Sequence, residues 1–400
     1  MRFVIIGGGI AGTTCAEELR KLQPEAEIVL VSEEAHPLYS RVLLPHYLKG
    51  KVPRERVFLK SEEWYGKQGI EWISDMCVVK LDSKNAFVEL SDGRELPYDK
   101  VLIATGGDLQ TLSEDLRGVS YLRTLDDADH LLQMIREKER PLAGAVYGGG
   151  FIACEYINLF VQEGIQTTAV FRGPRFWPRV LDAESGTLLN ARLAAMGVTV
   201  MPETTIERLL GEKELEGFAT HRGTVACGIL GIGLGIASEL AWVREAGIEV
   251  GKGVLANEYL ETNAPNVYAA GDGAEFFDTV VGHERLVGTW MNALSQGRTV
   301  AKTMAGERTA FRLVSSYATN LLGLEIIFVG EPDRSHADEV LVRGSAADGG
   351  VTQLFLKQNR VVGATIIGRN ADRMPITKLI DGQVDVEGMK KDLENPAVIL

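Results

Sequence analysis

The sequence has few cysteines, and none of them lies near another. The four cysteines, among 400 residues, form no Cys-x-x-Cys motif and no Cys/His metal-binding pattern. This spacing excludes a small disulfide scaffold and is typical of free thiols in a reducing compartment. Histidine is also scarce, with six residues and no ligand spacing, so we expect no metal site.

Long hydrophobic runs and an excess of basic charge are lacking as well. The longest charge-free run, residues 223–238, contains five glycines and is too short to span a membrane. The apolar start is broken by three consecutive glycines, unlike a secretory signal. A net charge of −13 disfavours nucleic acid and anionic membranes as partners. We expect a soluble, cytoplasmic protein without an integral membrane segment or a nucleic-acid partner, either monomeric or homodimeric.

Glycine, by contrast, is abundant and clustered, with 44 residues. The motif Gly7-x-Gly9-x-x-Gly12 stands between an apolar strand pattern and a helical pattern, and a second strand pattern follows. This βαβ arrangement is typical of dinucleotide binding: the first glycine makes the turn, the second admits a pyrophosphate and the third packs helix on strand. Glu33, about 20 residues further on, is placed to accept a hydrogen bond from an adenosine ribose.

A second copy of the pattern, Gly148-x-Gly150-x-x-Ala153, follows about 140 residues later. No acid ends the next strand, and Arg172 and Arg175 stand there instead. The two arginines either pair with a 2′-phosphate, which favours NADPH, or belong to a solvated basic loop. The two glycine turns together predict two nucleotide-binding domains.

Several dispersed motifs give the chain a resemblance to a known family over nearly its whole length. These motifs, besides the glycine turns, are Tyr39-Ser40-Arg41, Ala104-Thr105-Gly106, Gly231-Ile232-Gly233 and residues 262–272. With them the chain resembles the flavin-dependent pyridine nucleotide oxidoreductases with two dinucleotide domains. Within that family it looks most like NADH:rubredoxin reductases, ferredoxin reductases of oxygenase systems and the flavin domains of assimilatory nitrite reductases.

The resemblance implies FAD on the first glycine turn and NAD(P)H as co-substrate on the second. The expected fold class is α/β, with two Rossmann-like dinucleotide-binding domains and a small α+β C-terminal domain. The expected domains are residues 1–112 with 240–309 for FAD, 113–239 for NAD(P) and 310–400 at the C-terminus.

Residue roles are implied by the same resemblance. The FAD contacts are expected from Arg41, the backbone at Val78, Thr105, Gly106, Gly271 and Asp272, and the nicotinamide contacts from Gly231 and Gly233. Asp272 also suits a helix N-cap, and Arg41 an ordinary ion pair. A helix from about Trp290 is expected to direct its N-terminus at the flavin.

His46 and Glu155 are the expected catalytic pair. His46 falls where ferredoxin reductases carry a lysine near the flavin, and Glu155 matches a glutamate beside the nicotinamide pocket. Such a pair suits proton management at flavin N5 or orientation of the nicotinamide. The alternative interpretation makes His46 a surface residue and Glu155 a favourable first-turn residue of a helix.

No cysteine stands where disulfide-reducing relatives carry theirs, so electrons are expected to pass directly from flavin to an acceptor. The expected partner is a small iron–sulfur or rubredoxin-type protein, with the basic docking candidates Arg369, Arg373, Lys378, Lys390 and Lys391. Two other functions stay open: an NAD(P)H oxidase or quinone/dye reductase, and an FAD-holding subunit of a larger complex that uses no free NAD(P)H.

Overall fold

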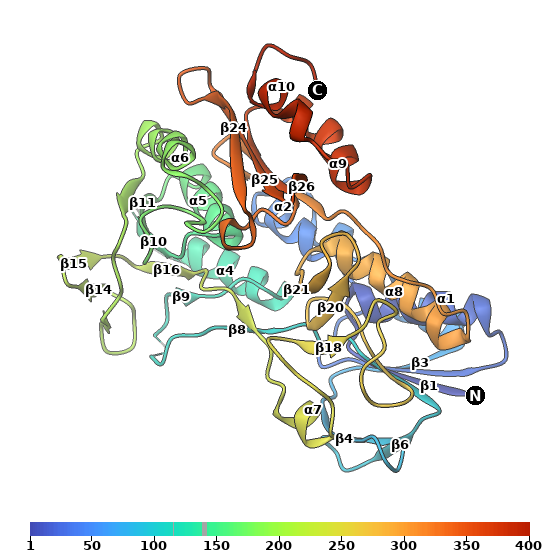
Figure 1. Cartoon of the computed structure of the whole chain (residues 1–400). Helices are drawn as coiled ribbons and strands as arrows, with labels where there is room; N and C mark the ends of the chain where they lie inside the picture. Colours follow the sequence, from blue (N-terminus) through green and yellow to red (C-terminus); the bar gives the residue numbers. More distant parts are fainter. Residues whose placement is uncertain (115, 138–141) are drawn as a thin grey trace. The chain divides into compact units, whose positions relative to one another are not determined.

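The computed structural model describes residues 1–114, 116–137 and 142–400. The chain forms two compact units, coloured along the sequence in Figure 1. Unit 1 comprises Met1–Leu43, Val52–Asp108 and Ile236–Leu313, and unit 2 comprises Leu44–Lys51, Leu109–Gly235 and Val314–Leu400. Unit 2 therefore contains most of the two stretches that we assign to an NAD(P) domain and a C-terminal domain, and the domain boundaries stay a prediction.

Unit 1 is built on a five-stranded parallel sheet. In pairing order its strands are β19 (Val267–Ala269), β7 (Lys100–Ile103), β1 (Arg2–Ile6), β2 (Glu27–Val31) and β3 (Ile70–Ile73). The apolar runs of β1 and β2 are almost wholly buried, as a parallel sheet covered on both faces requires. The apolar pattern of the sequence therefore forms the core of this unit.

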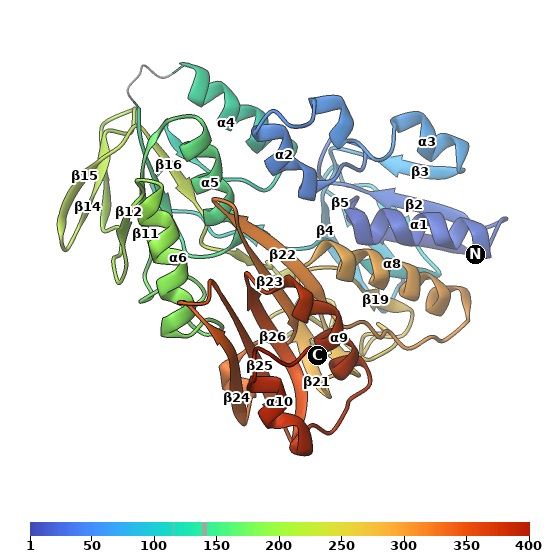
Figure 2. The ribbon, with the colours of Figure 1, turned by 90° about the horizontal axis from the view of Figure 1, so that it is seen from above.

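Two helices of unit 1, α1 (Ile10–Leu22) and α8 (Trp290–Ala305), lie side by side (Figures 1 and 2). They approach closely because Gly297 has no side chain. A β-carbon placed on Gly297 would lie 2.4 Å from the carbonyl oxygen of Ala11. Helix α8 then ends at Gly306, whose φ of +103° favours glycine.

The remaining elements of unit 1 are short and are grouped around the parallel sheet. Two three-stranded sheets pair in the orders β4-β5-β6 and β18-β20-β21. Their bounds are β4 (Val78–Asp82), β5 (Phe87–Leu90), β6 (Glu95–Pro97), β18 (Val254–Ala256), β20 (Ala274–Asp278) and β21 (His283–Leu286). The helices are η1 (Arg41–Leu43), η2 (Arg54–Val57), α3 (Glu62–Lys67) and α7 (Ala241–Glu245).

Unit 2 repeats the parallel arrangement with the second glycine turn. Its sheet has the order β12 (Thr199–Met201), β11 (Gln166–Val170), β10 (Ala143–Tyr147), β16 (Ile229–Ile232) and β9 (Val119–Ser120). Helices α5 (Phe151–Gln162), α6 (Ala183–Ala195), α4 (Leu125–Glu137) and α2 (Leu44–Leu48) belong to this unit. A three-stranded sheet joins β13 (Arg208–Leu210), β14 (Gly217–Thr220) and β15 (Gly223–Ala226). Where the chain passes between the units, β8 (Asp108–Leu109) pairs with β17 (Ile236–Ala237), which is assigned to unit 1.

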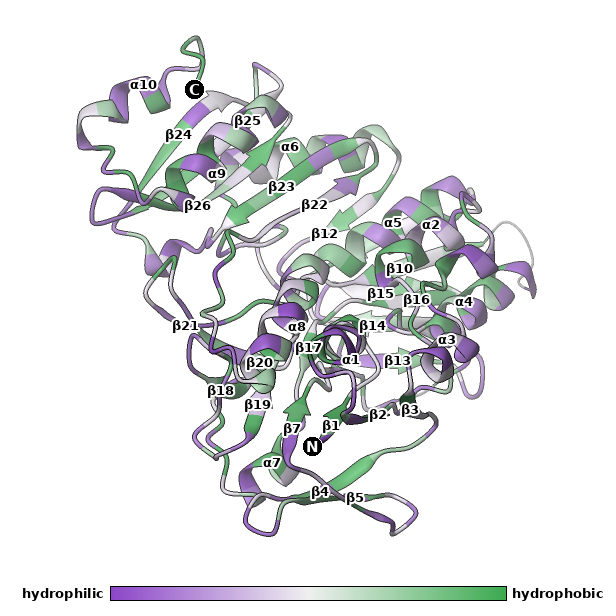
Figure 3. Cartoon of the chain, turned by 90° about the vertical axis from the view of Figure 1, so that its right-hand side faces the viewer, coloured by the Kyte–Doolittle hydropathy of each residue, from purple (hydrophilic) through white to green (hydrophobic). Residues whose placement is uncertain are grey.

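The C-terminal part of unit 2 is an antiparallel sheet of five strands. Its order is β22 (Ser316–Leu321), β23 (Leu324–Gly330), β26 (Arg360–Ile367), β25 (Gly350–Lys357) and β24 (Glu339–Ser345). Strand β23 is coloured as largely hydrophobic in Figure 3, and its residues Ile326–Val329 are buried. The helices are η3 (Arg334–His336), η4 (Asn370–Asp372), α9 (Arg373–Asp381), η5 (Glu387–Met389) and α10 (Lys390–Glu394).

A buried arginine fastens the end of the chain to this sheet. Arg343, on β24, is 2% exposed and lies 3.3 Å from Asp372 Oδ2. Its guanidinium also donates to the carbonyl oxygens of Asn395 and Val398. Thr352 Oγ1 donates to the same Asp372 oxygen over 2.8 Å, so the buried charges are both paired and hydrogen-bonded.

The fold class expected from the sequence is confirmed: an α/β chain with two parallel sheets that each carry a glycine turn, and an α+β C-terminal part. Within the described residues, no helix is both long and apolar enough to cross a membrane.

The contact between α1 and α8 gives a test of packing with a matched control. Gly297→Ala is expected to destabilise the protein by about 1–3 kcal/mol, because its β-carbon collides with backbone that cannot yield. Gly66→Ala, in α3, meets no atom within 4 Å and is expected to be neutral or stabilising by up to about 1 kcal/mol. Urea unfolding of both variants measures the difference, and equal stabilities would contradict the packing argument.

Candidate functional site

The first glycine turn shows what each of its glycines does. Gly7 has a φ of +115°, and a β-carbon on it would lie 2.3 Å from the Ala104 carbonyl oxygen. A β-carbon on Gly12 would lie 2.0 Å from the Gly7 carbonyl oxygen. A β-carbon on Gly9 would meet nothing within 4 Å. The first and third glycines are therefore needed for close packing, and the middle glycine faces open space.

The start of α1 fits the diphosphate of a dinucleotide. Its N-cap is Gly9, which makes no side-chain cap, and its first turn holds no acidic residue. The first amide groups of a helix have no partner within the helix, and the helix dipole makes this end positive. A phosphate beside Gly9 therefore finds room, donors and a favourable potential.

Beyond β2, the acid predicted for the ribose is joined by a cysteine. Glu33 is exposed, and its carboxylate lies near the half-buried Cys77 thiol. Burial, followed by the Glu33 charge, raises the pKa of Cys77. Val78, the residue predicted to contact the adenine, begins β4 directly after this cysteine.

Arg41 is held by a neighbour that the sequence reasoning missed. Its guanidinium pairs with the Glu34 carboxylate, which also accepts from the Tyr39 hydroxyl. Arg41 Nη1 lies 3.0 Å from the Tyr39 hydroxyl oxygen. Burial lowers the pKa of Arg41, but the charges of Tyr39, Glu34 and Asp272 outweigh it and raise that pKa. Asp272 is therefore close enough to act on Arg41, as expected if both face one ligand.

Asp272 stands in a turn that α8 supports from behind. The preceding Gly271 has a φ of +88°, and its amide donates to Gln296 Oε1 over 2.6 Å. Gln296 is fully buried, and its Nε2 has no acceptor among the described residues. An unmatched buried donor is costly unless a partner is present. This donor, next to the Gly271 turn, fits a site completed by a bound molecule.

Several of the residues predicted to hold FAD lie at the same edge of one sheet. Gly7, Glu33, Thr105 and Gly271 each follow the carboxyl end of a strand of the parallel sheet, which is where α/β folds bind ligands. Gly106 has a φ of +76°, and its carbonyl oxygen would lie 2.5 Å from a β-carbon on Gly273. The geometry brings these residues together, while their individual contacts with FAD stay predictions.

The second glycine turn follows the same geometry with one difference. Gly148 has a φ of +147°, and a β-carbon on it would lie 2.3 Å from the Gly233 carbonyl oxygen. Ala153, in the third position, is buried. A β-carbon on Gly150, however, would lie 3.9 Å from the indole nitrogen of Trp177. The middle glycine of this turn therefore faces an aromatic side chain instead of open space.

Gly231 has a packing role that needs no ligand. A β-carbon on it would lie 2.5 Å from the ring of Tyr156, whose hydroxyl is 2.8 Å from Ser120 Oγ. This buried contact holds α5 against β16 and β9, and the sequence reasoning did not identify it.

The two arginines after β11 have different surroundings. Arg172 is exposed. Arg175 is half-buried, and its Cδ would lie 2.9 Å from a β-carbon on Gly186 in α6. Within the described residues neither guanidinium forms an ion pair, so both predicted roles, phosphate binding and a solvated loop, stay open.

Glu155 has an ion-pair partner that the sequence reasoning missed. Lys49, just beyond α2, lies 2.8 Å from Glu155 Oε2, and the two side chains are 13% and 20% exposed. His46, on α2, is exposed, and its pairing with Glu155 stays a prediction. Lys49 lies outside α2 and 106 positions before Glu155, so no local sequence signal identifies it as the partner.

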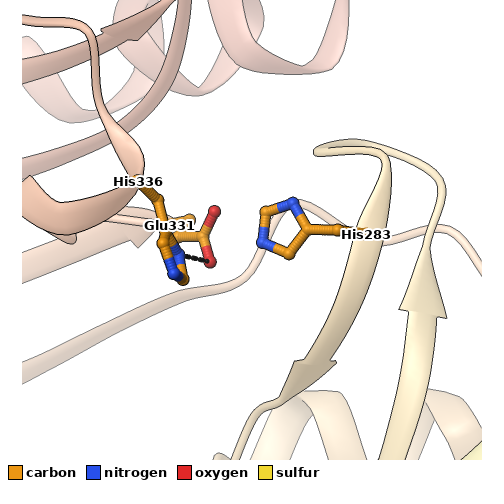
Figure 4. Close-up of side chains that lie close together, drawn as sticks. All are labelled: His283, Glu331 and His336. Atoms are coloured by element: carbon orange, nitrogen blue, oxygen red, sulfur yellow. Dashed lines mark hydrogen bonds and ion pairs between the residues drawn. The ribbon is translucent and has the colours of Figure 1, made fainter.

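A histidine and a glutamate in the C-terminal part of unit 2 form a pair of metal-ligand type. His336 Nδ1 lies 3.0 Å from Glu331 Oε1 (Figure 4). Two such groups do not complete a structural zinc site, which takes four ligands. His283, also drawn in Figure 4, belongs to unit 1. The expectation of no metal site stays untested.

Comparison with known proteins identifies one family and several similar proteins. The model of the pyridine nucleotide-disulphide oxidoreductase family matches residues 1–297. A ferredoxin–NAD(+) reductase component of the biphenyl dioxygenase system from Paraburkholderia xenovorans is 30% identical over 390 residues, which cover 96% of this chain and 93% of that protein. A nitrite reductase [NAD(P)H] from Bacillus subtilis is 28% identical over 98% of this chain, but the chain spans only 48% of its length.

A solved structure shares the fold. The covalent putidaredoxin reductase–putidaredoxin complex contains a chain that matches with a TM-score of 0.91 and 24% identity, covering 98% of this chain and 95% of that chain.

The turn at Gly271 gives a test of the FAD site. Gln296→Leu removes the acceptor of the Gly271 amide, so we expect a loss of about 1–3 kcal/mol in unfolding free energy and a lower FAD content after purification. Arg298→Ala, at an exposed position of α8, serves as the control and is expected to change neither quantity. FAD released by heating and measured by absorbance gives the content. A Gln296→Leu variant that retains FAD like the control would count against this assignment.

Proposed function

Since the chain belongs to the pyridine nucleotide-disulphide oxidoreductase family, we propose that it oxidises NAD(P)H and delivers the electrons to a small redox protein. Enzymes of this family use FAD, with NAD(P)H as substrate. The observation that carries the proposal is the pair of glycine turns, each at the carboxyl edge of its own parallel sheet. We assign FAD to unit 1 and NAD(P)H to unit 2. The protein acts in the cytoplasm as a monomer or homodimer.

The cysteines support direct transfer without a disulfide step. All four are free; three of them, Cys15, Cys154 and Cys227, are buried, and Cys77 is half-buried. Burial raises the pKa of Cys15 and of Cys154, and raises that of Cys227 to about 12. A thiol with so high a pKa is protonated at neutral pH and is a poor nucleophile. The chain therefore offers no thiolate pair of the kind that reduces disulfides.

The residues of unit 1 divide the work of holding the cofactor. The turn from Gly7 to Gly12 supplies amide donors for the diphosphate, and Asp272 supplies a carboxylate beside Arg41. The N-terminus of α8 is capped by Thr289, whose Oγ1 accepts from the Asn292 amide over 3.4 Å. Its positive end suits an electron-rich ring. When bound, FAD supplies the chemistry that this chain's side chains lack: it accepts a hydride and releases single electrons.

Fewer basic residues are available to dock the acceptor than the sequence suggests. Three of the five basic candidates are engaged within unit 2: Lys390 with Glu339 and Glu387, Arg369 with Asp372, and Arg373 with Ser316. Lys378 and Lys391 are exposed. An acidic iron–sulfur or rubredoxin-type partner needs cations that it can reach, and these two lysines are the best placed of the five.

Anaerobic titration tests the proposed function. We expect NADH or NADPH to bleach the flavin absorbance of the purified protein, and the more effective nucleotide identifies the co-substrate. Dithionite, which reduces flavin without a nucleotide site, is the control. A flavin that dithionite bleaches but neither nucleotide bleaches would overturn the proposal in favour of an FAD-holding subunit. Rapid oxygen consumption with NAD(P)H alone would favour an oxidase.

Glu155, its partner Lys49 and the predicted residue His46 give a second test. We expect Glu155→Gln and Lys49→Met to slow flavin reduction by NAD(P)H about 10-fold to 100-fold in stopped-flow experiments, because each breaks a half-buried ion pair. His46→Ala slows reduction only if the histidine takes part, as the sequence predicts. Unchanged rates in all three variants would remove this group from the mechanism.

A further inference from the structure

The two glycine turns differ at their middle glycine. A β-carbon on Gly9 would meet nothing within 4 Å, whereas one on Gly150 would lie 3.9 Å from Trp177 Nε1. Trp177 comes from the segment between β11 and α6, where the sequence reads Phe176-Trp177-Pro178. The pyrophosphate of a dinucleotide approaches the middle glycine of such a turn. The indole nitrogen of Trp177 therefore borders the place where a nucleotide phosphate would lie.

The position of Trp177 is fixed from several sides. Its amide donates to the Gly149 carbonyl oxygen over 3.1 Å, which ties it directly to the turn. Its own carbonyl oxygen accepts from the amides of Val180 and Leu181 over 2.9 and 2.8 Å. The indole packs against the rings of Phe151 and Phe328, with centroids 5.1 and 5.2 Å away.

The backbone of Trp177 is also strained. Its φ is +41°, in a region that bulky residues rarely adopt. Such strain persists only where surrounding contacts enforce it, and it concentrates at ligand-binding sites. The hydrogen bonds and ring contacts of Trp177 hold it in this conformation.

The indole N–H of Trp177 is a donor without a protein acceptor. Across residues 1–114, 116–137 and 142–400, no side chain or carbonyl accepts from it, and the residue is half-buried at the turn. An indole N–H can only donate, so a fitting ligand atom is an acceptor such as a phosphate oxygen. Helix α5, which starts at Phe151, has no side-chain cap and no acid in its first turn, so its amides also favour an anion.

We propose that Trp177 positions the pyridine nucleotide in unit 2 by donating its indole N–H to a pyrophosphate oxygen. The proposal rests on the proposed function, because it requires that NAD(P)H binds at the turn from Gly148 to Ala153. It adds a side-chain donor to the amide donors of the turn. The end of β11 is followed by no acid that could hold the adenosine ribose, and the indole donor compensates for that missing contact.

The test is ligand binding to the FAD-loaded protein. Trp177→Phe keeps an aromatic ring and removes the donor, and Trp242→Phe, in α7 of unit 1, is the matched control. ADP-ribose, which contains the pyrophosphate but no nicotinamide, is titrated by calorimetry. We expect Trp177→Phe to weaken its binding about tenfold and to raise KM for NAD(P)H similarly, with kcat little changed. The control is expected to bind like the wild-type protein.

A second variant covers the case in which Trp177→Phe does not fold. Gly150 has a φ of −128°, which alanine adopts without strain, and its β-carbon would stay 3.9 Å from the indole nitrogen. Gly150→Ala is therefore expected to fold and keep its FAD, but to lose ADP-ribose binding because the methyl group fills the space of the phosphate.

The outcomes distinguish the role of Trp177 from the proposed function. Wild-type protein that binds neither ADP-ribose nor NAD(P)H would overturn the proposed function, and with it the role of Trp177. If the wild-type protein binds ADP-ribose and Trp177→Phe binds it within twofold, the role of Trp177 alone is overturned. Tighter binding by Trp177→Phe would show that the indole obstructs the turn, which also contradicts the proposal.

Discussion

The close approach of backbone to backbone at the glycine turns is the constraint on which both candidate sites depend. The Gly7 and Gly148 turns each come within 2.3 Å, measured from a notional β-carbon, of a carbonyl oxygen on the neighbouring strand end. Only glycine satisfies both the distance and the positive φ at these positions. This approach places the start of a helix directly at the edge of a parallel sheet, where unpaired amides and the helix dipole converge.

The sequence predicted the features that follow from local pattern. Apolar runs and glycine spacing located both βαβ units, because strand burial and turn geometry leave a strong signal over a few residues. Helix α8 was expected to begin at about Trp290, and it does. The sequence was sufficient to place the residues around Gly7 and Asp272 at one edge of the sheet, because the carboxyl ends of parallel strands must share an edge.

What could not be predicted depends on contacts between segments distant in sequence. Lys49 and Glu155 are 106 positions apart, and nothing local to either residue marks the other as its partner. The pair of Gln296 with Gly271 depends on where α8 lies against the sheet, and the contact of Trp177 with Gly150 depends on a strained backbone conformation. In the sequence Arg343 looks like an ordinary strand arginine, because its acceptors at the end of the chain become apparent only in the folded structure. Each of these side chains is specified by tertiary packing, on which a sequence pattern carries little information.

The surroundings of the two candidate sites suit two different residence times of a bound molecule. In unit 1, the turn that follows β19 is supported by a fully buried glutamine on α8, and α8 is packed against α1 at Gly297. A turn held by such buried packing opens only when tertiary structure opens, which suits a resident cofactor. In unit 2, the second turn is bordered by a connecting segment that carries exposed Arg172 and half-buried Trp177. A co-substrate must enter and leave in every catalytic cycle, and under the proposed assignment a turn bordered by a connecting segment allows that exchange while the Trp177 indole holds the phosphate. Under the proposed assignment, the same glycine motif serves both roles, and the side chains packed around each turn decide which role it takes.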